Sequence, residues 1–141
     1  MTTEDSAIRL LRIDHVVLRA VDMVRMERFY CDVLGCSVER RQDDLDLVQL
    51  RAGAALVDLV DVSGKLGRED GGGVPRRDAR NVDHVCFRIE SFDLEALQAH
   101  FAAHGVQVRE SGLRFGAEGR GLSIYIEDPE GNVVELKGPP A

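Results

Sequence analysis

The 141-residue sequence contains no tryptophan, only three cysteines, and no run of about 18 apolar residues. The missing apolar run excludes a transmembrane helix. The acidic start of the chain, Met1–Asp5, lacks the apolar stretch of a signal peptide. An odd number of cysteines without a CxxC motif does not predict a disulfide framework. We therefore expect free thiols in a cytoplasmic protein with no membrane partner.

Positive charge is also scarce, because the chain has 18 Lys and Arg residues but 25 Asp and Glu residues, which gives a formal charge of −7. Nucleic-acid binding needs a basic surface that neutralises phosphates, so this balance argues against a nucleic-acid partner. The composition, 44% apolar and 30% charged, is typical of a globular domain. We expect a single domain over residues 9–138, preceded by a flexible tail at residues 1–8.

What the sequence does contain is an internal repeat. The segment Asp14–Leu18 (DHVVL) returns as Asp83–Phe87 (DHVCF). Each copy precedes an amphipathic helix pattern that ends at a glycine, Gly35 in the first half and Gly105 in the second. Strand-like residues follow each glycine, for example Val106–Val108. Each half therefore reads as strand, helix and three further strands.

This pattern predicts an α+β fold made of two βαβββ modules, at about residues 11–62 and 82–138. Residues 63–81 between them are rich in glycine and charge, and we expect them to form a plain connecting linker rather than a mobile lid. Neither module is large enough to bury a sufficient core alone, so the two are expected to share one.

Each half also places one imidazole and one carboxylate at matching positions. Side chains alternate between the two faces of a strand. His15 and Asp58 in the first half are therefore matched by His84 and Glu135 in the second. A single strand histidine is more often structural, but a repeated pair favours a ligand role. Imidazole and carboxylate together suit Zn, Fe, Ni, Mn or Co. Symmetric pairing of the modules would bring the four side chains together as a divalent-metal site.

At these residues the chain resembles the vicinal-oxygen-chelate superfamily, which includes glyoxalase I, extradiol dioxygenases, and fosfomycin- and bleomycin-resistance proteins. The resemblance covers about residues 11–138. It rests on the two Asp-His motifs, on Phe29–Gly35, and above all on Ser123–Leu136 (SIYIEDPEGNVVEL). It implies an open, cup-shaped mixed sheet built from paired modules. It also implies a homodimer. In some members of the superfamily the two chains exchange modules, so that each site uses both chains.

The resemblance places metal ligands at His15, His84 and Glu135, and Asp58 stands where glyoxalase I has a glutamate. Aspartate is one methylene shorter, so the reach of Asp58 to the metal is left open. A glyoxalase-like enzyme would isomerise a small oxygenated or thiol-conjugated substrate, such as a glutathione adduct, through a metal-bound enediolate. Glu135 would then be the catalytic base.

The resemblance also suggests residues that contact the substrate. Arg19 stands where glyoxalases carry an arginine that binds a glutathione carboxylate, although a solvent-facing arginine is the simpler interpretation. Ser123 and Tyr125 share one face of their strand. Tyr125 would orient the substrate at the catalytic centre. Alternatively, Tyr125 would simply fill part of the hydrophobic core.

Two other activities of the superfamily remain open. A site with two histidines and one carboxylate would match an extradiol ring-cleavage dioxygenase. However, residues 116–118 lack the histidine that serves as acid and base in those enzymes. A bleomycin-resistance-like protein would bind an antibiotic without a metal. Such proteins usually lack the full ligand set and have aromatic walls, whereas aromatic residues make up only 5% of this chain. The sequence therefore favours a metal-dependent lyase or isomerase.

Overall fold

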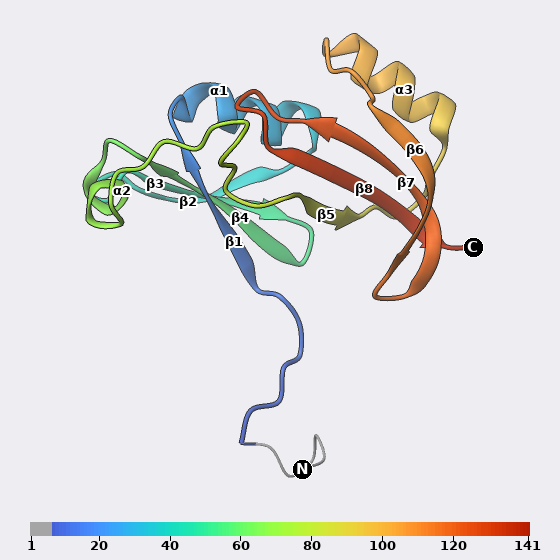
Figure 1. Cartoon of the computed structure of the whole chain (residues 1–141), viewed down its shortest axis with the longest axis horizontal. Coiled ribbons are helices and arrows are strands. Elements are labelled where there is room, and N and C mark those ends of the chain that lie inside the picture. The colour runs from blue at the N-terminus through green and yellow to red at the C-terminus, as the bar shows by residue number, and fades with distance from the viewer. Residues whose placement is uncertain (1–6) are drawn as a thin grey trace.

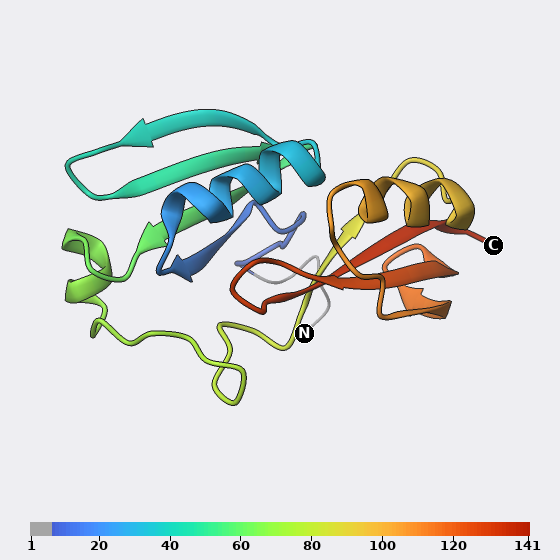
Figure 2. The ribbon, with the colours of Figure 1, turned by 90° about the horizontal axis from the view of Figure 1, so that it is seen from above.

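Two four-stranded sheets lie side by side in the computed structural model, which describes residues 7–141. The strand order is β1-β4-β3-β2 in the first sheet and β5-β8-β7-β6 in the second, so the two orders are equivalent. Helices α1 and α3 cover the same side of the pair of sheets (Figures 1 and 2). The predicted α+β class is confirmed, whereas most of the tail expected at residues 1–8 lies outside the described residues.

Module one contains β1 (His15–Ala20), α1 (Met23–Arg28), a π-helical turn η1 (Phe29–Val33), β2 (Ser37–Gln42), β3 (Leu47–Ala52) and β4 (Ala55–Asp61). Asp22 caps α1, because its side chain accepts a hydrogen bond from the backbone N–H of Arg25 at 3.0 Å. Gly35 follows the helical segment with a φ of +79°, a left-handed conformation that favours glycine. The aspartate and the glycine therefore set the two ends of this segment.

Module two contains β5 (Val85–Arg88), α3 (Leu94–Ala103), β6 (Glu110–Gly116), β7 (Gly119–Glu127) and β8 (Val133–Pro140). The strand expected at Val106–Val108 is absent, and β6 begins only at Glu110. The reason lies at the end of α3, where the N–H of Val106 donates to the carbonyl of Phe101 at 2.8 Å. This bond closes the helix end and delays the strand.

The linker contains a short helix, α2 (Lys65–Glu69), that the sequence did not predict. Arg19 in β1 fixes it to the first sheet. The Arg19 guanidinium donates to the carbonyl of Gly67 at 3.2 Å and to that of Gly73 at 2.9 Å. Asn81, at the other end of the linker, exchanges hydrogen bonds with the backbone of Arg19.

One hydrophobic core joins the two modules. Its most buried members come from both halves: Leu18, Ala20, Met26, Tyr30, Leu50, Val57, Leu59, Phe101, Ile124, Ile126 and Val134. Across the boundary, the hydroxyl of Tyr30 in η1 donates to the carboxylate of Asp128 at 2.8 Å. Burial, together with the charge of Asp128, raises the pKa of Tyr30 well above 10. The helical segment of module one is thus attached to the second sheet.

The first strand of each module remains at a sheet edge. Within residues 7–141, β1 pairs only with β4, and β5 pairs only with β8. Unpaired strand edges are sites where another strand can add. In the same part of the chain, no helix is long and apolar enough to cross a membrane.

Candidate metal centre

The four candidate ligands form two pairs, one in each module. Strands β1 and β4 are parallel neighbours, and His15 stands two residues before the residue that faces Asp58. Strands β5 and β8 repeat this arrangement, because His84 stands two residues before the residue that faces Glu135. The internal repeat of the sequence is therefore also a repeat of site geometry, with one imidazole and one carboxylate on each sheet.

In module two the pair is in direct contact. Nε2 of His84 lies 3.1 Å from Oε1 of Glu135, whose side chain is buried. The hydroxyl of Ser123 donates to Oε2 of Glu135 at 2.7 Å. Burial would raise the pKa of Glu135, but hydrogen bonds from Ser123 and Tyr125 and the charge of His84 lower it below its usual value. This carboxylate is therefore held in its ionised form.

In module one the carboxylate lacks part of its hydrogen bonding. Asp58 is only 3% exposed, and its Oδ2 accepts a hydrogen bond from Gln49 at 3.2 Å. Its Oδ1 is buried and has no partner among residues 7–141. A buried carboxylate oxygen without a partner is costly unless a cation or donor reaches it. The donor set of His15 and Asp58 thus fits a divalent metal.

Each candidate histidine is oriented by the aspartate that precedes it. Asp14 lies 2.7 Å from Nδ1 of His15, and Asp83 lies 2.7 Å from Nδ1 of His84. The contact with Asp14 raises the pKa of His15 above 6.5, and Asp58 adds to this effect. In metal sites a carboxylate at one ring nitrogen directs the other toward the metal. Sequence reasoning missed this role of the aspartates, although the repeated Asp-His dipeptide carried the signal.

The two pairs do not meet within one chain. Among residues 7–141, no group of three or more His, Cys, Asp or Glu side chains is placed to hold a metal ion. The expectation that module pairing unites all four ligands is therefore not met inside the monomer. The physical reason is that the modules pack through α1 and the contact between Tyr30 and Asp128, which leaves the edges of β1 and β5 unjoined.

A small cavity lies beside the pair of module two. Its volume is about 270 Å³, and His84, Tyr125, Arg80 and Arg109 are among the residues that line it. The Tyr125 ring stands edge-on to the His84 ring, with 5.8 Å between their centres. Nε of Arg80 is buried and has no partner in the described part of the chain. Sequence reasoning missed Arg80, which belongs to the linker and not to a repeated motif.

Ser123 and Arg19 have partners within the protein. Ser123 is fully buried and donates to Glu135, so it acts on the candidate ligand. Arg19 lies on the same face of β1 as His15, but its guanidinium is bonded to two linker carbonyls. Among the described residues it has no carboxylate partner, so its charge is not neutralised locally.

Residues 12–136 match the family described as the Glyoxalase/Bleomycin resistance protein/Dioxygenase superfamily. The chain belongs to this superfamily. Its members include metal-dependent enzymes that act on small molecules. The resemblance seen in the sequence is thereby confirmed, while the match itself does not distinguish among the activities that the superfamily contains.

Three relatives illustrate this range. Virulence protein STM3117 of Salmonella typhimurium (strain LT2) is 32% identical over 131 residues, which are 89% of this chain and 82% of that protein. Its crystal structure has a TM-score of 0.71, 27% identity, and a match over 92% of this chain and 98% of that chain. Lactoylglutathione lyase from Agrobacterium tumefaciens has a TM-score of 0.65 at 25% identity, over 90% and 92% of the two chains. The fosfomycin resistance protein FosX of Listeria monocytogenes has a TM-score of 0.63 over 92% of this chain and 93% of that chain. At 17% identity, this match shows a shared fold alone.

Proposed function

We propose that this chain is a divalent-metal-dependent enzyme, closest in site chemistry to glyoxalase I, that isomerises a small oxygenated or thiol-conjugated substrate. The observation that supports this proposal is the repeated pair of an imidazole and a buried carboxylate, with one oxygen of Asp58 unpartnered among residues 7–141. His15, Asp58, His84 and Glu135 would hold the metal, which would be Zn, Ni, Fe, Mn or Co.

Each side chain has a distinct role in this proposal. When bound, the metal would stabilise the negative charge that develops on the substrate oxygens. Glu135 would accept a proton from one substrate carbon at Oε1 and return it to the neighbouring carbon, while Ser123 holds its Oε2. Tyr125, which lines the cavity beside His84, would orient the substrate.

The arginines suggest that the substrate carries an anionic group. Arg80 offers a buried N–H without a partner in the described chain, and Arg109 lines the same cavity beside His84. Arg19 supplies a guanidinium without a carboxylate partner on the face of His15. A guanidinium binds a carboxylate through paired hydrogen bonds. A carboxylate-bearing thiol adduct, such as one of glutathione, fits this chemistry.

We further infer that each site is shared by two chains in a homodimer. Histidine ligands stand at or beside the start of β1 and of β5, the two strands whose outer edges have no partner among residues 7–141. If β1 of one chain joins β5 of another, His15 and Asp58 would meet His84 and Glu135 of the partner subunit. A complete site would then require both copies.

Metal analysis and an activity assay test the proposed function together. We expect about one equivalent of a divalent metal per chain in wild-type protein and its loss in His84→Ala. His104→Ala is the matched control, because His104 takes no part in either pair. The activity assay follows conversion of the hemithioacetal of methylglyoxal and glutathione to a thioester.

The outcomes separate the alternatives. Stoichiometric Zn or Ni that is lost only in His84→Ala supports an isomerase. Iron with ring cleavage of a catechol would favour the dioxygenase instead. Protein that takes up no metal under replete conditions contradicts a metal-dependent enzyme and favours an antibiotic-binding protein. Metal binding without thioester formation would exclude the glyoxalase substrate and retain the metal site.

A further inference from the structure

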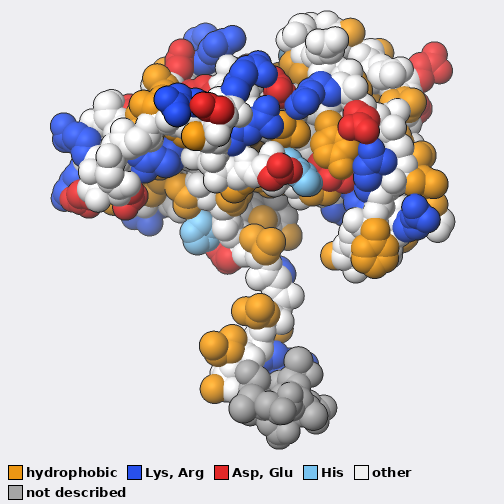
Figure 3. Space-filling view, viewed as in Figure 1, with side chains coloured by type: hydrophobic (Ala, Val, Ile, Leu, Met, Phe, Trp, Pro, Cys, Tyr) orange, Lys and Arg blue, Asp and Glu red, His pale blue; other side chains and the backbone are white. Residues whose placement is uncertain are grey.

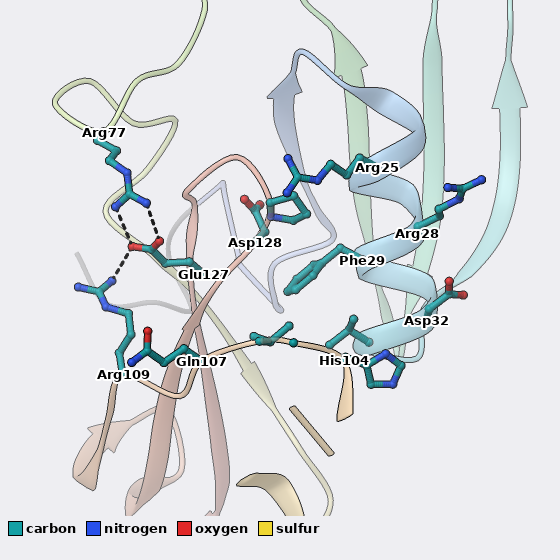
Figure 4. Close-up of a pocket in the computed structure, with 14 residues that line it drawn as sticks. Arg25, Arg28, Phe29, Asp32, Arg77, His104, Gln107, Arg109, Glu127 and Asp128 are labelled. Atoms are coloured by element: carbon teal, nitrogen blue, oxygen red, sulfur yellow. Dashed lines mark hydrogen bonds and ion pairs between the residues drawn. The ribbon is translucent and has the colours of Figure 1, made fainter. Parts of the chain in front are cut away.

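A second and larger cleft lies where the two modules and the linker meet. Its volume is about 750 Å³, within the range of small-molecule sites, and none of the four candidate metal ligands lines it. Helix α1, the end of β7, the segment between α3 and β6, and the linker provide its walls (Figure 4). A ligand in this cleft would touch both halves of the molecule.

One wall of the cleft carries more positive charge than its carboxylate can neutralise. Glu127 is shared by Arg77 and Arg109, each with a nitrogen 3.1 Å away, and by Arg80 at 3.7 Å. Figure 4 shows Glu127 between the guanidinium groups of Arg77 and Arg109. Arg80 does not line the cleft, and the one carboxylate offsets one of the two lining guanidinium groups, so one positive charge remains at this wall.

The opposite wall carries a further guanidinium. Arg25 reaches from α1 toward the turn between β7 and β8, and within residues 7–141 its guanidinium has no hydrogen-bond or ion-pair partner. Asp128 at that turn forms no ion pair with Arg25 among residues 7–141, and its carboxylate accepts hydrogen bonds from Tyr30 and Asn132. At the rim, Arg28 and Asp32 stand four residues apart on the helical segment and bring one charge of each sign.

This concentration of arginines stands out on a chain with a formal charge of −7. In the space-filling view, Lys and Arg side chains gather over α1, the linker and the β7–β8 turn (Figure 3). Such a positive region inside a concave surface attracts anions and repels cations. A ligand with one negative charge would satisfy one wall only, whereas a ligand with two would reach both.

We propose that this cleft binds a small polyanion with two or more phosphate or carboxylate groups. One group pairs with Arg25, and another pairs with Arg77 and Arg109 across the cleft. Guanidinium groups suit both anions, because their N–H donors match two oxygens at once. The proposal goes beyond the enzymatic function above and does not depend on a metal.

Calorimetric titration with inorganic pyrophosphate, and separately with citrate, tests this proposal in the full chain at low ionic strength. We expect saturable binding that Arg25→Gln and Arg77→Gln each weaken by about tenfold, the size expected for one charge-assisted hydrogen-bonded contact. Arg40→Gln on β2 removes the same charge outside the cleft and should bind like wild type. The stronger of the two probes identifies phosphate or carboxylate as the preferred group.

A further control separates the cleft from the metal centre. Pyrophosphate and citrate also bind metals, so His84→Ala must bind the probes as tightly as wild type. Equal affinities in wild type, Arg25→Gln and Arg77→Gln would overturn the proposal, as would loss of binding in His84→Ala alone. Absence of saturable binding of both probes up to about 1 mM, where the binding free energy is only about −4 kcal/mol, would also overturn it.

Discussion

Two buried carboxylates in this protein have opposite surroundings. Asp128 accepts hydrogen bonds from Tyr30, from the side chain and backbone of Asn132, and from the backbone of Glu130. Asp58 is equally buried, yet one of its oxygens has no partner within residues 7–141. Because buried polar atoms are normally satisfied, the first carboxylate belongs to the architecture, whereas the second keeps the unpartnered oxygen that makes it a candidate ligand.

The hydroxyl of Tyr30 should contribute measurably to stability. Tyr30→Phe removes the hydrogen bond to Asp128 and leaves a buried carboxylate with one partner fewer. We expect the free energy of unfolding to fall by about 2 kcal/mol, the usual size for a hydrogen bond to a charged group. Urea denaturation measures this change. A loss below about 0.5 kcal/mol would contradict the prediction.

Cys36 should react slowly at neutral pH. Burial raises the pKa of its thiol to about 11, and the nearby Cys31 adds to this effect. Because the thiolate is the reactive form, only about 0.1% of Cys36 is reactive at pH 8, against about a quarter for an ordinary thiol. Alkylation by iodoacetamide, followed by peptide mass spectrometry, should accelerate about tenfold per pH unit from pH 7 to 10. A rate that levels off below pH 9 would show that the pKa is not raised.

At the scale of elements, the linker depends on one side chain of β1. Arg19→Ala removes the hydrogen bonds to Gly67 and Gly73 that fix α2 and the glycine segment. We expect amide hydrogen exchange in residues 64–73 to become about tenfold faster, while β3 and β4 keep their protection. Arg40→Ala provides the control, and unchanged exchange in Arg19→Ala would show that the linker is held by other contacts.

Local signals in the sequence predicted most elements, and packing decided the rest. The glycines Gly35 and Gly105 act within a few residues of each helix end, so sequence alone was sufficient to place them. The late start of β6 and the helix in the linker follow from hydrogen bonds at a helix end and to Arg19. The matching positions of a histidine and a carboxylate in each module were predictable because the repeat marks them, but the separation of the two pairs depends on how the modules pack.

At the scale of the whole molecule, a mixing experiment tests whether sites are shared between chains. His15→Ala and His84→Ala are each expected to lose metal binding. When the two variants are unfolded and refolded together, half of the dimers should be mixed, and each mixed dimer should hold one site with both histidines intact. Metal binding should therefore recover to about a quarter of the wild-type level.

Metal binding can recover in this experiment only if each site is shared between two chains. If both modules of a site come from the same chain, every chain in the mixture carries a defective site and no metal binding returns. Analytical ultracentrifugation of the mixture verifies that dimers have formed. If dimers are present and metal binding does not recover, the sites are not shared between chains.

The matched pairs in the two modules also have a consequence for how this chain can evolve. A dimer of single modules would be perfectly symmetric, and each substitution would change both sides of its site at once. Here the two halves of the repeat are encoded separately, so one half carries Asp58 and the other Glu135. Each substitution alters one side only. In the proposed shared site, the two sides can therefore carry different side chains, which suits a substrate whose two ends differ.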